Sequence, residues 1–250
     1  MRYGVQLYSL KNEINELGLD AVLSAVKDAG FDCVETAAFD FITPEEWVDT
    51  LSRYELKAVS AHVGLDLIDK YLPYAEALNP EAIVLPWVDF SVLDDKEKKQ
   101  ELVSAMQEAN KKIKAVGAKF AYHNHEHEFA GGKDRVFDLI KSVDGLSSQL
   151  DIFWAVFAGQ DPLELMDKYG EKLWCLHVKE LDVRTTGNPR EFPNAIVGEG
   201  KSKSKECIQK AVTMGHDLFI LEVEGFPCDW KEYLKKSCDA MKAFAENKNS

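Results

Sequence analysis

The feature that most constrains the fold of this chain is a strict alternation between short apolar runs and longer amphipathic stretches. The amphipathic stretches repeat apolar residues at helical spacing, and several begin at an Asp or a Thr-Pro pair and end at a Gly, as helices do. The apolar runs have the length and composition of buried strands. Eight runs are expected to form strands, at residues 3–9, 33–39, 57–63, 82–88, 119–125, 147–153, 173–179 and 218–224.

Alternating strands and helices predict a parallel sheet whose strands are connected by helical crossovers. Eight units in 250 residues correspond to about 31 residues each, which is the usual size of a single (β/α)8 TIM barrel. An open, doubly wound sheet is the alternative, but no GxGxxG phosphate loop follows the first strand. We therefore expect one α/β barrel domain over residues 1–250.

One irregular stretch, residues 181–204, interrupts the pattern with Gly, Pro and polar residues, and it is a candidate lid over the site. Within it, VGEGKS at Val197 to Ser202 is rich in Gly and contains a Lys. It lacks the spacing of a P-loop, so we expect a turn.

Composition and charge exclude several classes of protein. The chain is 46% hydrophobic and 29% charged, which is typical of an ordered globular protein. A formal charge of −13 argues against nucleic acid and anionic membrane as partners, because these bind clustered Lys and Arg. Five cysteines without a CxxC pair, no secretory signal and no run of eighteen apolar residues favour a cytoplasmic location.

Polar side chains gather where the last four expected strands end. In a (β/α)8 barrel, side chains at the carboxyl ends of the strands converge on one site. Residues two apart on a strand point to the same face, so each of these strands can present inward-facing groups. The polar residues at these strand ends are His123, Asn124 and His125 on the fifth strand, Asp151 on the sixth, His177 and Lys179 on the seventh, and Glu222 and Glu224 on the eighth; on the fifth strand, His123 and His125 share a face.

Each of these residues also has a simpler structural explanation. Asp151 could cap the next helix, His177 could be a hydrogen-bonded core histidine, and Glu222 could pair with a Lys. Four buried polar groups without a shared task would carry a large desolvation cost, so their convergence favours a metal or acid/base centre. Asp, His and Glu suit one divalent ion, namely Mn²⁺, Co²⁺, Zn²⁺ or Mg²⁺, which could polarise vicinal oxygens of a sugar or polyol.

Three further residues are expected to lie outside this centre. Glu126 and His127 follow the fifth strand, at the opposite parity or in the loop, and we expect both to be exposed to solvent. His216 precedes the eighth strand and should lie at the opposite rim of the barrel in a structural role.

The ordered set of strand motifs resembles the sugar phosphate isomerase/epimerase superfamily, which has a xylose isomerase-like barrel. This superfamily includes ketose 3-epimerases, inosose dehydratase, dehydroshikimate dehydratase and endonuclease IV. The resemblance covers nearly the whole chain and is closest to a subgroup with an HNH sequence. The segments that carry it are YGVQLYSL, GFDCVETAAF, VSAHVG, YHNHEHEF, LDIFWAVFAG, CLHVKE and LEVE.

The resemblance implies that Asp151, His177 and Glu222 are metal ligands. The epimerases have a Glu as the fourth ligand, on the fifth strand, where this chain has His123; Glu128 is the second choice for this ligand. This departure weakens the two-glutamate mechanism of the epimerases.

The resemblance also implies roles in the substrate pocket. Dehydratase-like members place a base two residues beyond the fifth-strand ligand, which is His125 in this chain. The substrate-binding candidates are His62, Trp87, Glu128 and Glu224, and Lys179 is expected to face the same pocket.

The function expected from these observations is that of a metal-dependent isomerase or epimerase acting on a sugar or cyclitol in carbohydrate metabolism. His125 or Glu222 would remove a proton next to a carbonyl, and Lys179 would donate a hydrogen bond to the oxyanion of the enediolate. The alternatives are a dehydratase or lyase of a keto-sugar or inosose, and a metal-free sugar-binding barrel. The expected partner is a small-molecule sugar or polyol, and a homo-oligomer stays open.

Overall fold

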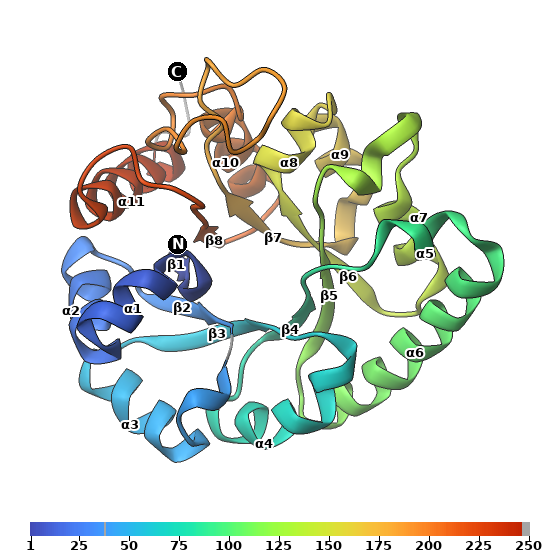
Figure 1. Ribbon diagram of the computed structural model, residues 1–250, viewed down its shortest axis with the longest axis horizontal. Helices are drawn as coiled ribbons and strands as arrows, with labels where there is room; N and C mark the ends of the chain where they lie inside the picture. The colour runs from blue at the N-terminus through green and yellow to red at the C-terminus, as the bar shows by residue number, and fades with distance from the viewer. Residues whose placement is uncertain (38, 247–250) are drawn as a thin grey trace.

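Eight parallel strands form a closed barrel in the computed structural model, which describes residues 1–37 and 39–246. Each strand pairs with the next along the chain, and β1 closes the barrel by pairing with β8 (Figure 1). The predicted (β/α)8 TIM barrel is confirmed. The strands are β1 (Arg2–Gln6), β2 (Cys33–Thr36), β3 (Lys57–His62), β4 (Ala82–Leu85), β5 (Lys119–His123), β6 (Leu146–Asp151), β7 (Leu173–Val178) and β8 (Leu218–Leu221).

Helices surround the barrel (Figure 1). The α-helices are α1 (Lys11–Leu17), α2 (Leu19–Ala29), α3 (Pro44–Arg53), α4 (Ile68–Leu78), α5 (Phe90–Asp94), α6 (Lys96–Ala115), α7 (Arg135–Ser142), α8 (Ile152–Phe157), α9 (Pro162–Tyr169), α10 (Ser204–Thr213) and α11 (Trp230–Glu246). Short 3-10 helices are η1 (Leu7–Leu10), η2 (Phe39–Phe41), η3 (Leu65–Leu67), η4 (His127–Gly132) and η5 (Gly170–Lys172). None of the helices in the described part of the chain is long and apolar enough to cross a membrane.

Local sequence signals explain several of these boundaries. The Thr-Pro start of α3 forms a capping box, in which Thr43 accepts a hydrogen bond from the Glu46 amide and the Glu46 carboxylate accepts one from the Thr43 amide. At the carboxyl end of α2, Gly30 adopts φ 98°, a left-handed conformation that glycine reaches without steric cost.

The main hydrophobic core lies between the strands and the helices. Outward-facing strand residues such as Phe120 and Phe219 pack there with helical side chains such as Val22 and Met106, and all four are fully buried. Burial of this apolar surface is the principal force that closes the barrel.

The interior of the barrel changes from apolar to polar along its axis. Near the amino ends of the strands, Cys33 and Cys175 belong to a small buried apolar cluster. Two residues later on the same strands and the same faces stand Glu35 and His177, which are also fully buried. The polar layer therefore lies toward the carboxyl ends of the strands.

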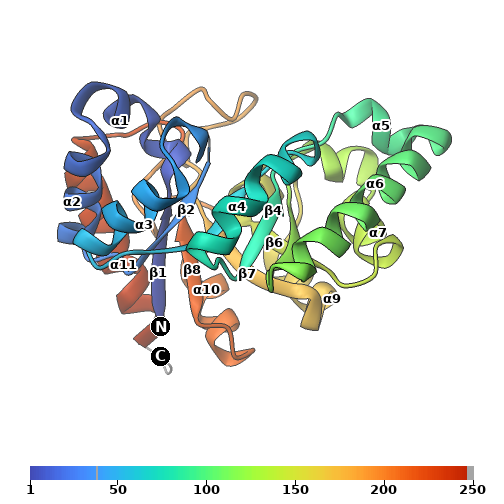
Figure 2. The ribbon, with the colours of Figure 1, turned by 90° about the horizontal axis from the view of Figure 1, so that it is seen from below.

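The two ends of the barrel differ. Figure 2 shows the N and C labels together at one end and the long loop between β7 and α10 at the opposite end. That loop corresponds to the candidate lid.

The Gly-rich VGEGKS segment wraps around the carboxylate of Glu180. The Glu180 oxygens accept hydrogen bonds from the Gly198 amide at 2.8 Å, the Ser202 amide at 2.7 Å and the Ser204 hydroxyl at 2.5 Å. At Gly200 an added Cβ would lie 2.3 Å from the carbonyl oxygen of Leu181, so the turn requires glycine. These amides thus bind an anion of the chain itself rather than a phosphate.

Candidate metal centre

Four side chains at the carboxyl ends of β5, β6, β7 and β8 meet inside the barrel. Each of His123, Asp151, His177 and Glu222 offers one ligand atom, and these atoms all lie within 4.8 Å of one another. Glu222 Oε2 lies 3.0 Å from His177 Nδ1 and 3.9 Å from His123 Nε2. The structure therefore brings together the four residues that the sequence singled out as metal ligands.

Asp151 has one satisfied and one unsatisfied carboxylate oxygen. Its Oδ1 accepts a hydrogen bond of 2.9 Å from the Trp154 amide and caps α8, so the simpler structural role also holds. Its Oδ2 is buried and has no hydrogen-bond partner. Burial raises the pKa of Asp151 to about 8, although the positive charges of Lys179 and His177 act in the opposite direction.

The donor set fits a divalent ion on chemical grounds. A buried acceptor without a partner is costly, and a cation beside Asp151 Oδ2 would remove that cost. Two imidazoles and two carboxylates supply mixed nitrogen and oxygen ligands, and the two negative charges balance a dication. A second group that could hold an ion consists of His62, His123 and His177, and it shares two residues with the first.

Glu35, which sequence reasoning missed, lies beneath this cluster on β2. Its carboxylate accepts hydrogen bonds from Gln6 Nε2, Ser60 Oγ, Gln149 Nε2 and His177 Nε2, at 2.7, 2.6, 2.7 and 2.6 Å respectively. Burial alone would raise its pKa, but the charges of the neighbouring histidines hold the pKa of Glu35 well below its usual range. The available signal was a charged residue inside the apolar run CVETAAF.

His177 stands between two carboxylates. Burial alone would lower its pKa, but Glu35 and Glu222 raise the pKa of His177 to about 10. Burial lowers the pKa of His123 well below its usual range, so this second ring is neutral. The two candidate histidine ligands therefore differ in charge state although they lie side by side, with ring centroids 4.7 Å apart.

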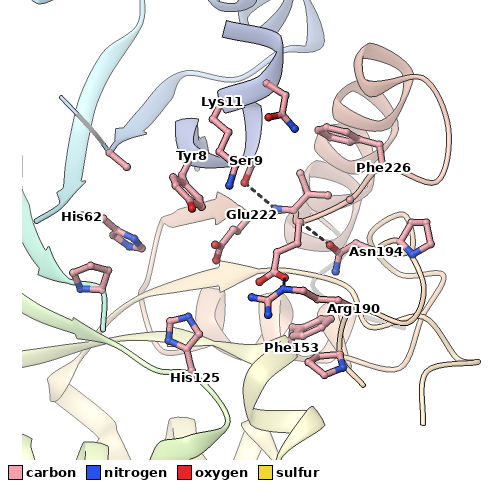
Figure 3. A pocket seen from close by; sticks show the side chains of 18 of the residues that line it. Tyr8, Ser9, Lys11, His62, His125, Phe153, Arg190, Asn194, Glu222 and Phe226 are labelled. Atoms are coloured by element: carbon pink, nitrogen blue, oxygen red, sulfur yellow. Dashed lines mark hydrogen bonds and ion pairs between the residues drawn. The ribbon is translucent and has the colours of Figure 1, made fainter. Parts of the chain in front are cut away.

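The cluster forms one part of a pocket of about 950 Å³ at the carboxyl end of the barrel. Figure 3 shows His62, His125 and Glu222 pointing toward the same space from different strands. Three of the predicted substrate-binding residues, His62, Trp87 and Glu224, line the pocket, together with the candidate ligands His123 and Glu222. Aromatic lining residues, which offer flat apolar surfaces to the C–H faces of a sugar, are Tyr8, Trp87, Phe153, Phe192 and Phe226.

His125 lines the pocket next to His123, as the parity argument predicts. Its Nδ1 atom is buried and has no hydrogen-bond partner within the described protein. Burial lowers the pKa of His125 to about 4, so the ring is a neutral imidazole at physiological pH.

The structure gives Glu128 a different position from the one expected. It is fully buried but does not line the pocket or belong to either ligand group. Its carboxylate instead accepts hydrogen bonds of 2.5 Å from the Tyr122 hydroxyl and 2.8 Å from the His125 amide. This arrangement does not support the expectations that Glu128 binds substrate or serves as fourth ligand, because its carboxylate is held by Tyr122 and by the amide of His125.

Lys179 also departs from its expected role. Its side chain is fully buried, and its ammonium group lies 2.7 Å from Glu224 Oε1 and within 5 Å of the ring centroids of Phe153 (4.8 Å) and Trp154 (4.6 Å). Glu224 lines the pocket and Lys179 does not. The expected hydrogen bond from Lys179 to a substrate oxyanion is thus not supported by this arrangement.

His127 and Glu126 were predicted to be exposed to solvent, but both are partly buried. The His127 Nε2 atom lies 3.2 Å from the Val88 carbonyl oxygen and 3.0 Å from Glu128 Oε1, because η4 folds back toward the loop after β4. His216 lies just before β8, at the amino end of that strand and away from the cluster, as expected.

Part of the candidate lid forms a wall of the pocket. Residues 189–194 line it, and Arg190 Nε donates a hydrogen bond of 2.7 Å to Glu224 Oε2 (Figure 3). That residues 181–204 act as a lid stays a prediction.

Comparison with known proteins agrees with the fold. The sequence pattern of the xylose isomerase-like TIM barrel family matches residues 23–244. No curated protein gives a significant sequence match. A sugar phosphate isomerase/epimerase from Parabacteroides distasonis is 21% identical, with 98% of this chain and 94% of that chain covered and a TM-score of 0.76.

Two other solved structures are similar over their full length. The probable 3-DHS dehydratase AsbF from Bacillus anthracis is 15% identical over 97% of this chain and 99% of that chain, with a TM-score of 0.77. The IolI protein, solved with a bound zinc atom, is 14% identical over 100% of both chains, with a TM-score of 0.76. At these identities the structures show a shared fold, and with the family match covering most of the sequence, this chain belongs to the family of xylose isomerase-like TIM barrels.

Proposed function

We propose that this protein is a divalent-metal-dependent enzyme that isomerises or epimerises a sugar or cyclitol by removing a proton next to a carbonyl. The observation that carries the proposal is the unpartnered, buried Asp151 Oδ2 beside His123, His177 and Glu222, next to the pocket. Similar folds in an isomerase/epimerase and in a zinc-containing protein support it. The HNH sequence at residues 123–125 resembles that of the subgroup without a fifth-strand glutamate.

The residues divide the work as follows. An ion held by His123, Asp151, His177 and Glu222 would supply a Lewis acid that stabilises the negative charge of an enediolate. His125 and Glu222 line the pocket and can accept the proton. The aromatic wall would orient the sugar ring and exclude water from the reacting carbons.

Dehydration is the second candidate, and the identity of the fifth-strand residue favours it. Glu222 is the one carboxylate of the four-residue cluster that lines the pocket, because His123 stands where the epimerases are expected to have a glutamate. Epimerisation needs proton transfer on both faces of a carbon, whereas elimination of a β-hydroxyl group needs one base beside the acidic carbon. A metal-free sugar-binding barrel fits less well, because Asp151 Oδ2 would stay without a partner.

Proton exchange with solvent tests the proposal directly. Protein stripped with a chelator and reloaded separately with Mn²⁺, Co²⁺, Zn²⁺ or Mg²⁺ is incubated in D₂O with a panel of keto-sugars and inososes. We expect metal-dependent deuterium incorporation next to the carbonyl, seen by NMR, with carbonyl migration, stereochemical inversion or a conjugated enone identifying the reaction. A protein that binds none of the four ions and exchanges no proton would contradict the metalloenzyme proposal.

His125→Asn is expected to slow this exchange by about 10²- to 10⁴-fold while the ion stays bound, because a positioned base contributes a factor of that order. His127→Asn is the matched control: it changes a nearby histidine that does not line the pocket. Exchange rates and metal content are measured on both variants. If both slow the reaction equally, His125 acts through the structure of the loop and not as a base.

A further inference from the structure

A buried polar network contacts both candidate histidine ligands, at the ring nitrogen that points away from the four-residue cluster. Glu35 Oε1 lies 2.6 Å from His177 Nε2, and Gln149 Oε1 lies 3.1 Å from His123 Nδ1. The opposite nitrogens, His177 Nδ1 and His123 Nε2, are the ones near Glu222. All four network and ligand side chains are at most 1% exposed, so water does not compete for these contacts.

The direction of each hydrogen bond follows from Glu35. An ionised carboxylate only accepts, so every group that contacts it must donate. Gln149 contacts Glu35 Oε2 at 2.7 Å, and it must therefore present its amide nitrogen there. Its amide oxygen consequently faces His123 and His62, whose Nε2 atom lies 2.8 Å away.

The histidine protons are fixed by the same logic. His123 must donate from Nδ1 to the Gln149 oxygen, which leaves its Nε2 with a lone pair toward the cluster. His177 must donate from Nε2 to Glu35, which directs its Nδ1 toward the cluster. His62 donates its Nε2 proton to the same network, in which Gln149 and Glu35 are the acceptors. Its Nε2 atom is therefore not free to bind an ion.

We propose that Glu35 and Gln149 are positioning residues that select the tautomers of His177 and His123, so that both rings direct a lone pair into the four-residue cluster. This inference rests on the proposed function, in which these lone pairs bind the metal ion. It also selects the group of His123, Asp151, His177 and Glu222 over the group that contains His62 as the metal site. Neither positioning residue lines the pocket, so neither touches the substrate.

A misprotonated histidine cannot serve as a ligand. If His177 carried its single proton on Nδ1, that N–H would point at Glu222 and occupy the position of the lone pair. Outer groups that orient metal-binding histidines typically change metal affinity by about 10- to 100-fold when they are mutated.

Glu35→Gln is the main test variant. An amide offers one acceptor oxygen where the carboxylate offers two, so either His177 or the Gln149 amide loses its acceptor. We expect Zn²⁺ affinity, measured by competition with a chromogenic chelator, to fall about 10- to 100-fold. Gln149→Met, which removes the acceptor for His123 at similar volume, should have an effect of the same order.

Ser60→Ala is the matched control. Ser60 donates to the same Glu35 carboxylate at 2.6 Å but contacts neither candidate ligand, so Zn²⁺ affinity should stay within about 2-fold of wild type. Thermal melting of all three variants shows whether each one is folded. A loss of affinity in Ser60→Ala equal to that in Glu35→Gln would overturn the proposal, because the effect would then follow general disruption of the network.

The tautomers themselves are read by ¹H–¹⁵N correlation NMR of the histidine side chains. We expect His123 protonated on Nδ1 in both metal-free and Zn²⁺-loaded protein, and His177 protonated on Nε2 in the loaded protein. Gln149→Met should lose the unique His123 signal pattern. If both variants keep wild-type tautomers and affinity, the proposal is wrong. If wild type binds none of Mn²⁺, Co²⁺, Zn²⁺ and Mg²⁺, the proposed function fails, whereas the His123 tautomer in the metal-free proteins still decides this inference.

Discussion

Asp151→Asn is expected to abolish tight binding of a divalent ion and to lower turnover by about 1,000-fold or more, equivalent to ~4 kcal/mol of lost transition-state stabilisation. The amide keeps the oxygen that caps α8 at the Trp154 amide, so the barrel should stay folded. It removes the negative charge and the unpartnered Oδ2 atom of the cluster. Metal content by elemental analysis and the solvent-exchange assay measure the two effects.

Asp134→Asn is the matched control for this substitution. Asp134 caps α7 through the Phe137 amide, as Asp151 caps α8, but it belongs to neither of the two ligand groups. It should retain metal content and activity. Full activity in Asp151→Asn would show that Asp151 is only a helix cap.

Asp151→Asn should stabilise the metal-free protein relative to wild type at neutral pH. Burial raises the pKa of Asp151 to about 8, far above that of an aspartate in an unfolded chain, so the native state holds a proton that the unfolded state releases. Wild-type stability should therefore fall as the pH rises from about 4 to 8, and the asparagine variant should not share this loss. In urea unfolding at several pH values, the free energy of unfolding of Asp151→Asn should increase relative to that of wild type across this range.

The barrel was predictable because each strand and helix carries its own signal. The apolar run CVETAAF and the Thr-Pro start of α3 are local patterns, and the order of such patterns along the chain is sufficient to predict a closed parallel barrel. Strand parity also predicted that His123, Asp151, His177 and Glu222 would meet, because the carboxyl ends of the strands converge.

The parts of the site that could not be predicted depend on side-chain packing between distant strands. Glu35 and Gln149 lie 114 positions apart in different strands, and no local pattern in the sequence links them. Glu128 was misplaced because the turn of η4 is not encoded in a simple period. Lys179 follows the last residue of β7, where strict alternation no longer fixes the direction of the side chain.

Lys179→Met is expected to destabilise the protein by about 3–5 kcal/mol, the usual effect of removing one partner of a buried ion pair. The ammonium group of Lys179 lies 2.7 Å from Glu224 Oε1, and its positive charge also acts on Asp151 and Glu222. Methionine fills a similar volume but leaves these carboxylates without the charge that compensates them. Urea unfolding at neutral pH measures the loss.

Arg190→Met separates burial from simple pairing, because Arg190 binds the other oxygen of the same carboxylate. Its Nε lies 2.7 Å from Glu224 Oε2, the same distance as for Lys179, but its side chain is 69% exposed whereas that of Lys179 is 0% exposed. Exposed pairs contribute about 0–1 kcal/mol, so this variant should unfold nearly as wild type does. Adding Glu224→Gln to Lys179→Met should recover part of the lost stability, since one uncompensated charge is then removed. Equal losses in the two single variants would mean that the Glu224 contact, and not the buried charge, holds this wall of the pocket.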